Sequence, residues 1–189
     1  IHIYTPNAGT TGVSGLLVFS SGTTSSGNSG SISIGTGHAK TGGRGGALTL
    51  TVGEGTSGTG GVMRMYAGDS TEKTGGAMYI ESGHGSTTSS GMIQIRTANA
   101  GTSGYSGLLS FSSGSTTKGN SGYLYIGTGT ATVGHGGSIS MTVGNGDTGN
   151  GGSISVVAGR TSAAAGTGGH LEIASGEGSA ASSGNIHIY

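Results

Sequence analysis

A unit of about 15 residues recurs from one end of the chain to the other, and this recurrence constrains the fold more than any other feature. Each unit begins x-φ-x-φ-x-small-Gly, where φ is an apolar residue. A polar stretch rich in Gly, Ser and Thr follows and closes with Ser-Gly or Gly-Gly. Ala47–Gly61 and Val62–Gly76 are two consecutive units. Twelve full units and the start of a thirteenth fill the chain without a linker.

Apolar residues at positions two and four of every unit alternate with period two, which predicts strands and not helices. Position six is always small or β-branched. It reads Thr5, Ser21, Thr36, Val52, Ala67, Ser82 and then Thr97, Ser113, Thr128, Val143, Ala158, Ser175. The same six residue types recur in the same order. This order predicts two modules of six units, 1–91 and 92–184, with 185–189 starting a further unit of one continuous structure.

A single strand with one apolar face cannot bury that face alone, whereas stacked copies can. We expect the return segment of about nine residues after each strand to place the next strand parallel beside the last one. The sequence therefore predicts an all-β fold, a parallel β-solenoid with one rung per repeat and 12–13 rungs. Two alternatives stay open: a disordered Gly/Ser/Thr-rich linker and an antiparallel meander with long loops.

Composition and charge exclude several classes of protein. Seven Lys and Arg balance seven Asp and Glu, so the chain lacks the basic surface of a nucleic-acid binder and the polybasic stripe of a membrane-surface protein. No apolar run approaches the roughly 20 residues that a transmembrane helix needs. The absence of cysteine fits an extracellular or cell-surface location, which we expect.

Candidate chemical groups are few. Because the chain has only two aspartates, in distant units, we expect no enzymatic activity and no cofactor. A weak candidate for a metal site is the ladder at position eight, His38, Glu54, Asp69 and His84 on consecutive units. The favoured interpretation of this ladder is a solvated edge without metal, because the second module has Thr130, Asn145, Arg160 and Glu177 at these positions.

Positions one, three and five point away from the φ rows, since successive side chains of a strand alternate between faces. Several apolar residues gather on this outward face: Met92, Leu108, Tyr123 and Tyr125, with Leu16 and Val18 in the first module. Such a patch is typical of an interface, so we expect it to pack against a neighbouring copy or a further layer. Six threonines in the polar stretches could accept O-linked sugars: Thr23, Thr24, Thr87, Thr88, Thr116 and Thr117.

The units punctuated by Ser-Gly and Gly-Gly resemble the long Gly/Ser/Thr-rich repetitive β-solenoid proteins of microbial and algal cell surfaces, which are fibre-forming or adhesin-like. The resemblance implies a structural subunit or segment of an extracellular filament or surface appendage. Its partners would be further copies, joined end to end and laterally, and glycans. A surface- or carbohydrate-binding adhesin shaft is the alternative, and an ice-binding protein is a weaker one, because position three carries no repeated Thr-x-Thr plane.

The first four residues, Ile1-His2-Ile3-Tyr4, return unchanged as Ile186-His187-Ile188-Tyr189. The pattern therefore stops in the phase in which it starts. We expect Tyr189 to be followed by another unit on the same axis, in the same chain or in the next subunit.

Overall fold

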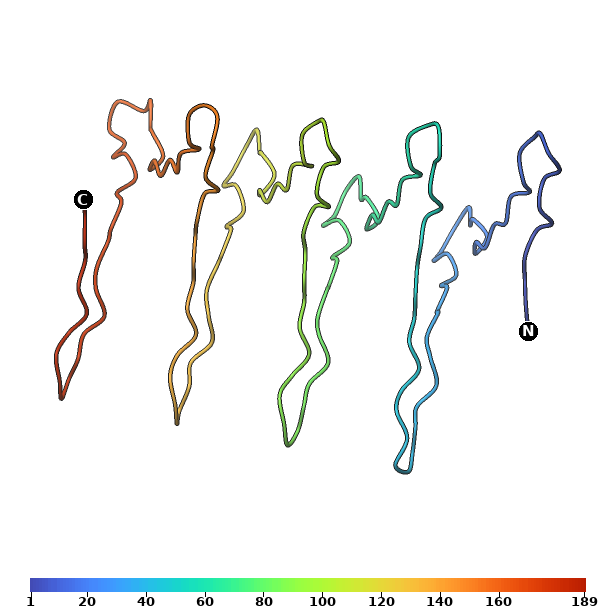
Figure 1. The fold of residues 1–189 in the computed structure, drawn as a ribbon, viewed down its shortest axis with the longest axis horizontal. Helices are drawn as coiled ribbons and strands as arrows, with labels where there is room; N and C mark the ends of the chain where they lie inside the picture. Colours follow the sequence, from blue (N-terminus) through green and yellow to red (C-terminus); the bar gives the residue numbers. More distant parts are fainter. The chain divides into compact units, whose positions relative to one another are not determined.

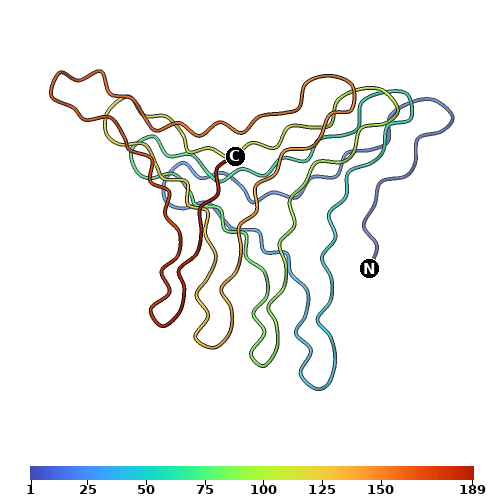
Figure 2. The ribbon, with the colours of Figure 1, turned by 60° about the vertical axis from the view of Figure 1, so that its left-hand side comes forward.

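The computed structural model describes residues 1–189, and its ribbon contains neither a helix nor a strand (Figure 1). Extended segments alternate with narrow loops along the chain, and Figure 2 shows the same alternation from another side. Two compact units divide the chain, Ile1–Ile93 and Gln94–Tyr189. This division falls two residues after the module boundary expected from the sequence. The structure contains no helix that could cross a membrane.

The prediction of an all-β fold and a parallel β-solenoid is wrong. No segment pairs with another as a strand, and the five backbone hydrogen bonds all lie within loops. A folded protein makes roughly one hydrogen bond per residue, far more than the backbone of this chain makes. A strand is stable only when its backbone N–H and C=O groups pair with a neighbouring strand. The extended segments thus have the side-chain alternation of strands without a strand partner in their own chain.

The physical reason is that each return segment closes on itself instead of forming a second wall. In all twelve units the glycine that ends the unit lies beside the residue at position six of the same unit. We call this contact the neck. The closing glycines are Gly15, Gly30, Gly46, Gly61, Gly76, Gly91, Gly107, Gly122, Gly137, Gly152, Gly169 and Gly184. Because the chain returns to the point where the loop began, the next extended segment starts at the neck, and the segments on the two sides of the neck form no strand pair.

The period-two alternation persists in part in the exposure of the side chains. After Ile1, apolar residues at positions two and four of the full units are 46–71% exposed, whereas the large apolar residues at positions one, three and five are 65–100% exposed. The rings of His187 and Tyr189, at positions three and five, stack with centroids 6.2 Å apart. Residues two apart therefore share a face, as they do in a strand.

The chain has no hydrophobic core. No residue is buried, and the exposed surface is 19076 Å², whereas a compact monomer of 17.9 kDa exposes about 8,000 Å² and a fully extended chain about 26,000 Å². The single chain thus retains about three quarters of the surface of the extended polypeptide. Its local geometry is regular, but its apolar side chains remain unpartnered.

Candidate functional site

The necks are the most regular feature of the structure, and two of them explain a constraint in the sequence. A Cβ atom on Gly15 would lie 2.8 Å from Cβ of Thr5, and one on Gly61 would lie 2.5 Å from Cγ1 of Val52. Real Cβ atoms do not approach other atoms so closely. At these two necks the closing residue is glycine because the neck has no room for a side chain, whereas at Gly122 and Gly184 a Cβ would make only ordinary contacts, at 3.6 and 3.7 Å.

Four loops are closed by a hydroxyl group at position six, which donates a hydrogen bond to the carbonyl oxygen of the closing glycine. We call them the hydroxyl-closed loops. Their bonds run from Thr5 to Gly15 at 3.2 Å, from Ser21 to Gly30 at 2.9 Å, from Thr36 to Gly46 at 3.2 Å and from Thr128 to Gly137 at 3.3 Å. Three of the four are the first three loops of the first module.

Four other loops are closed by the backbone, because the N–H of the closing glycine donates to the carbonyl of the glycine at position seven. We call them the backbone-closed loops. The pairs are Gly76 to Gly68 at 2.8 Å, and Gly91 to Gly83, Gly169 to Gly159 and Gly184 to Gly176 at 2.9 Å each. They are the last two loops of each module. Two of them have alanine at position six, Ala67 and Ala158, which carries no hydroxyl group.

Position nine, inside the loop, also differs between loops in a way that repeats in both modules. Thr24 and Thr116 donate to carbonyls two residues on, and Ser70 and Thr161 accept from backbone N–H groups. These are the local bonds that Ser and Thr form in turns. In the other eight loops position nine is alanine four times and glycine four times. At one of these glycines, Gly55, a Cβ would lie 2.8 Å from the carbonyl oxygen of Gly58.

Every hydrogen bond that involves a side chain is made by a Ser or Thr hydroxyl group within one unit. Nine Ser and Thr residues thus stabilise loops through their hydroxyl groups. All six threonines expected to accept sugars are exposed. The hydroxyl groups of Thr24 and Thr116 are used inside their loops.

The structure does not form the ladder of His38, Glu54, Asp69 and His84. Nowhere in the chain do three His, Asp or Glu side chains come together as metal ligands. The expected ladder depended on stacked rungs, whereas each of these residues sits in its own loop. A hollow of about 330 Å³ is lined by four consecutive residues, Arg96 to Asn99, and contains a single charged group.

The outward residues predicted to form an interface are all exposed in the single chain: Leu16 84%, Val18 67%, Met92 81%, Leu108 88%, Tyr123 100% and Tyr125 87%. This exposure does not distinguish them, because the φ rows are also uncovered. The predicted solenoid would bury the φ rows between stacked units. The structure adds them to the candidate association surface: each full unit presents two unpartnered apolar side chains, at positions two and four.

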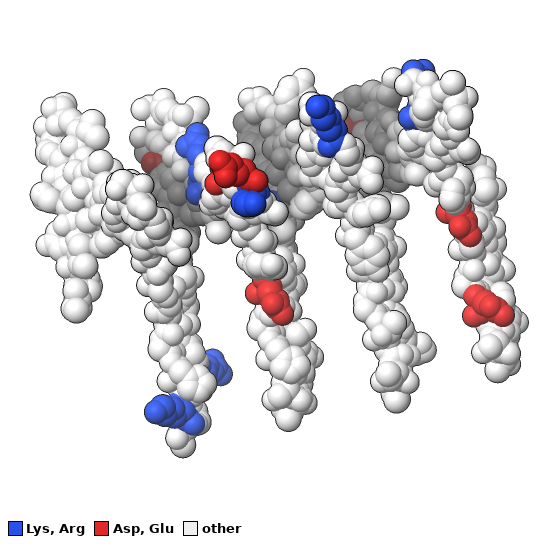
Figure 3. Space-filling model, turned by 180° about the vertical axis from the view of Figure 1, so that it is seen from behind, with Lys and Arg blue, Asp and Glu red and all other residues white.

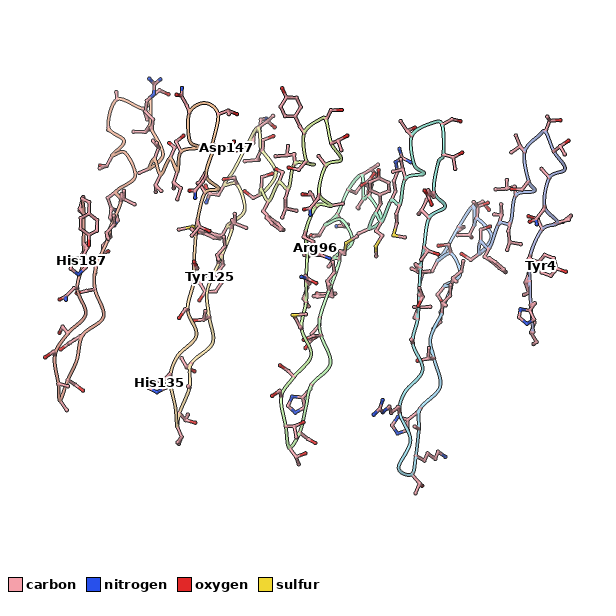
Figure 4. All side chains as sticks on the ribbon, in the orientation of Figure 1. Tyr4, Arg96, Tyr125, His135, Asp147 and His187 are labelled. Atoms are coloured by element: carbon pink, nitrogen blue, oxygen red, sulfur yellow. The ribbon has the colours of Figure 1, made fainter.

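Charged side chains are sparse on this surface. Figure 3 shows them as small, separate groups on the face in view. Only four of the fourteen lie in extended segments, namely Arg64, Glu81, Arg96 and Glu172, and the other ten lie in loops. In Figure 4 side chains project singly from the ribbon; His135 lies on a loop and Tyr125 on the segment before it.

The geometry supplies a repeated apolar surface with closed polar loops. Comparison with known proteins finds no matching family model, no similar curated protein and no similar solved structure.

Proposed function

We propose that this chain is a structural protein, a repetitive segment of an extracellular filament or surface appendage that works by associating with further copies of itself. The observation that carries the proposal is the exposure of both φ rows in every unit, on a chain whose surface of 19076 Å² is more than twice that of a compact monomer of its size. Apolar patches this extensive are typical of interaction surfaces.

Energetics support association over a stable single chain. An apolar side chain that goes from half exposed to buried contributes about 1 kcal/mol. The φ rows supply two such side chains per unit, so the gain grows with the number of units that engage. With seven positive and seven negative residues, copies do not repel one another strongly, and proteins of near-zero net charge tend to associate.

The first test is association of the unsubstituted chain, followed by sedimentation velocity from low to high micromolar concentration and by negative-stain electron microscopy. We expect large assemblies, with filaments in the micrographs. A chain that stays monomeric at high concentration would disprove the proposal.

Paired variants then show which face carries the association. Ile93→Ser with Leu109→Ser removes apolar side chains at position two, and Met92→Ser with Leu108→Ser removes their sequence neighbours at position one. Each pair replaces two large apolar residues, so the variants are matched in composition. We expect the position-two pair to reduce association more, because the φ rows run through all units whereas the outward patch is local.

A further inference from the structure

The loop of the tenth unit carries two asparagines that are each followed by glycine. Asn145-Gly146 occupies positions eight and nine, and Asn150-Gly151 occupies positions thirteen and fourteen. No other asparagine in the chain is followed by glycine. Asp147 lies on the same loop between the two pairs (Figure 4). A glycine leaves the backbone nitrogen after an asparagine open to the side-chain amide, because it has no Cβ in the way.

Asparagine occupies the same two positions in other units, with a different residue after it. At position eight, Asn7 and Asn99 are followed by alanine, and at position thirteen, Asn28 and Asn120 are followed by serine. The glycine before position thirteen has a positive φ in all three loops: 95° at Gly27, 106° at Gly119 and 128° at Gly149. The chain therefore contains matched sites that differ from those of the tenth unit in the residue after asparagine.

The two groups that would react are not held by the fold. Asparagine side chains often bond to nearby backbone groups in turns, but every side-chain hydrogen bond in this chain is made by Ser or Thr. The backbone N–H groups of Gly146 and Gly151 donate no hydrogen bond, unlike those of the closing glycines in the backbone-closed loops. Asn145 and Asn150 are exposed. Each side-chain amide is thus free to turn toward the next backbone nitrogen.

The reaction that this arrangement allows consumes only water. The backbone nitrogen of Gly146 loses its proton and attacks Cγ of Asn145. A bond forms between this nitrogen and Cγ, and the bond between Cγ and Nδ2 breaks to release ammonia. Water then opens the resulting succinimide ring. Attack at Cγ gives aspartate, whereas attack at the backbone carbonyl carbon gives isoaspartate, in which the main chain runs through Cβ and Cγ.

We propose that the loop of the tenth unit, residues 143–152, is a site of spontaneous deamidation, with Asn145 and Asn150 as the residues converted. Each conversion replaces a neutral amide with a carboxylate, so a chain of zero formal net charge gains two negative charges in one loop. The chemistry does not depend on the proposed function. It does remove the charge balance that favours association of copies.

The test is incubation of the unsubstituted chain in mildly alkaline buffer, followed by tryptic peptide mapping with mass spectrometry. The sequence has no Lys or Arg between Lys118 and Arg160, so Asn120, Asn145 and Asn150 lie in one peptide. We expect conversion at Asn145 and Asn150 to run ahead of conversion at Asn120, with aspartate and isoaspartate as products. The rate should rise with pH, because the attacking nitrogen must lose its proton. Conversion of Asn120 as fast as Asn150 would overturn the inference.

A loss-of-reaction variant uses position thirteen. Gly151→Ser gives the tenth unit the serine that the second and eighth units have, and Gly151 has open space around it and no positive φ. Conversion at Asn150 should fall to the level of Asn120, while conversion at Asn145 stays unchanged. Undiminished conversion at Asn150 would show that the glycine is not what makes the site reactive.

A gain-of-reaction variant uses position eight. Ala100→Gly places a glycine after Asn99, whose conversion should rise to the level of Asn145. This variant is better than Gly146→Ala, because a Cβ on Gly146 would lie 3.3 Å from the carbonyl oxygen of Asn150 and would disturb the loop. An unchanged Asn99 would count against the proposal.

Incubation in guanidinium chloride separates the effect of sequence from that of structure. We expect Asn145 and Asn150 to be converted as fast in native buffer as in denaturant, because the fold holds neither reacting group. Conversion confined to the denatured chain would show that the fold protects this loop, and the inference would then be wrong.

Discussion

The hydroxyl-closed and backbone-closed loops reach the same neck by different chemistry. In the first class the side chain at position six donates to the closing glycine. In the second class the closing glycine donates its own N–H to position seven. The backbone-closed loops therefore tolerate alanine at position six, as Ala67 and Ala158 show.

The comparison teaches that shape is the common requirement and the hydrogen bond is interchangeable. The loops that begin after Val52 and Val143 form necks with neither bond, because a valine methyl group packs directly against the closing glycine. Steric fit at the neck is thus present in all twelve units, whereas each type of hydrogen bond is present in four.

The largest effect is expected from filling a neck. Gly61→Ala would place Cβ 2.5 Å from Cγ1 of Val52, and overpacking of this kind costs about 1–3 kcal/mol. The loop should open, and cleavage after Glu54 by a glutamyl endopeptidase should become about five-fold faster or more, since 1.4 kcal/mol corresponds to a factor of ten. Gly60→Ala is the control, since Gly60 has open space around it. Restored protection in Val52→Ala with Gly61→Ala would show that the clash is the cause; equal cleavage of both single variants would argue against the neck.

An intermediate effect is expected where the two modules differ in backbone conformation. Gly149 has φ +128°, whereas Gly58, at the equivalent place in the first module, has no positive φ. Neither glycine has an atom near its Cβ position, so strain alone separates them. Gly149→Ala should cost about 1–2 kcal/mol, seen as faster cleavage after Asp147. Gly58→Ala should leave cleavage after Glu54 unchanged. Equal sensitivity would mean that the two loops share one conformation.

The smallest effect is expected from removing a single hydroxyl group. Thr36→Val keeps the shape, because valine already occupies position six elsewhere, but deletes the bond to Gly46. A hydrogen bond of this kind is worth about 0.5–1 kcal/mol, so trypsin cleavage at Lys40 and Arg44 should accelerate a few-fold. Ser175→Ala, in a backbone-closed loop, should not change cleavage after Glu177. If Ser175→Ala had the larger effect, the division into two classes of loop would be wrong.

Part of the candidate site was readable from the sequence. The apolar residues at positions two and four, the small residue at position six and the closing glycine are visible as a pattern, and so are the two modules. The ladder of His38, Glu54, Asp69 and His84 was not formed, because its proximity depended on a stacking that the pattern does not encode. The contact between Val52 and Gly61 was missed for the same reason: both residues are visible, but nothing in their spacing says that they touch.

The local period, the loop positions and the low content of charged residues follow from the sequence, because they depend on residues close together in the chain. What each return segment does is visible only in the folded chain. A stretch of about nine small polar residues can travel to a new rung or close on itself, and the contact between position six and the closing glycine selects closure. Strand pairing depends on non-local contacts, since backbone groups pair with whichever segment lies beside them. In this chain no two segments pair as strands.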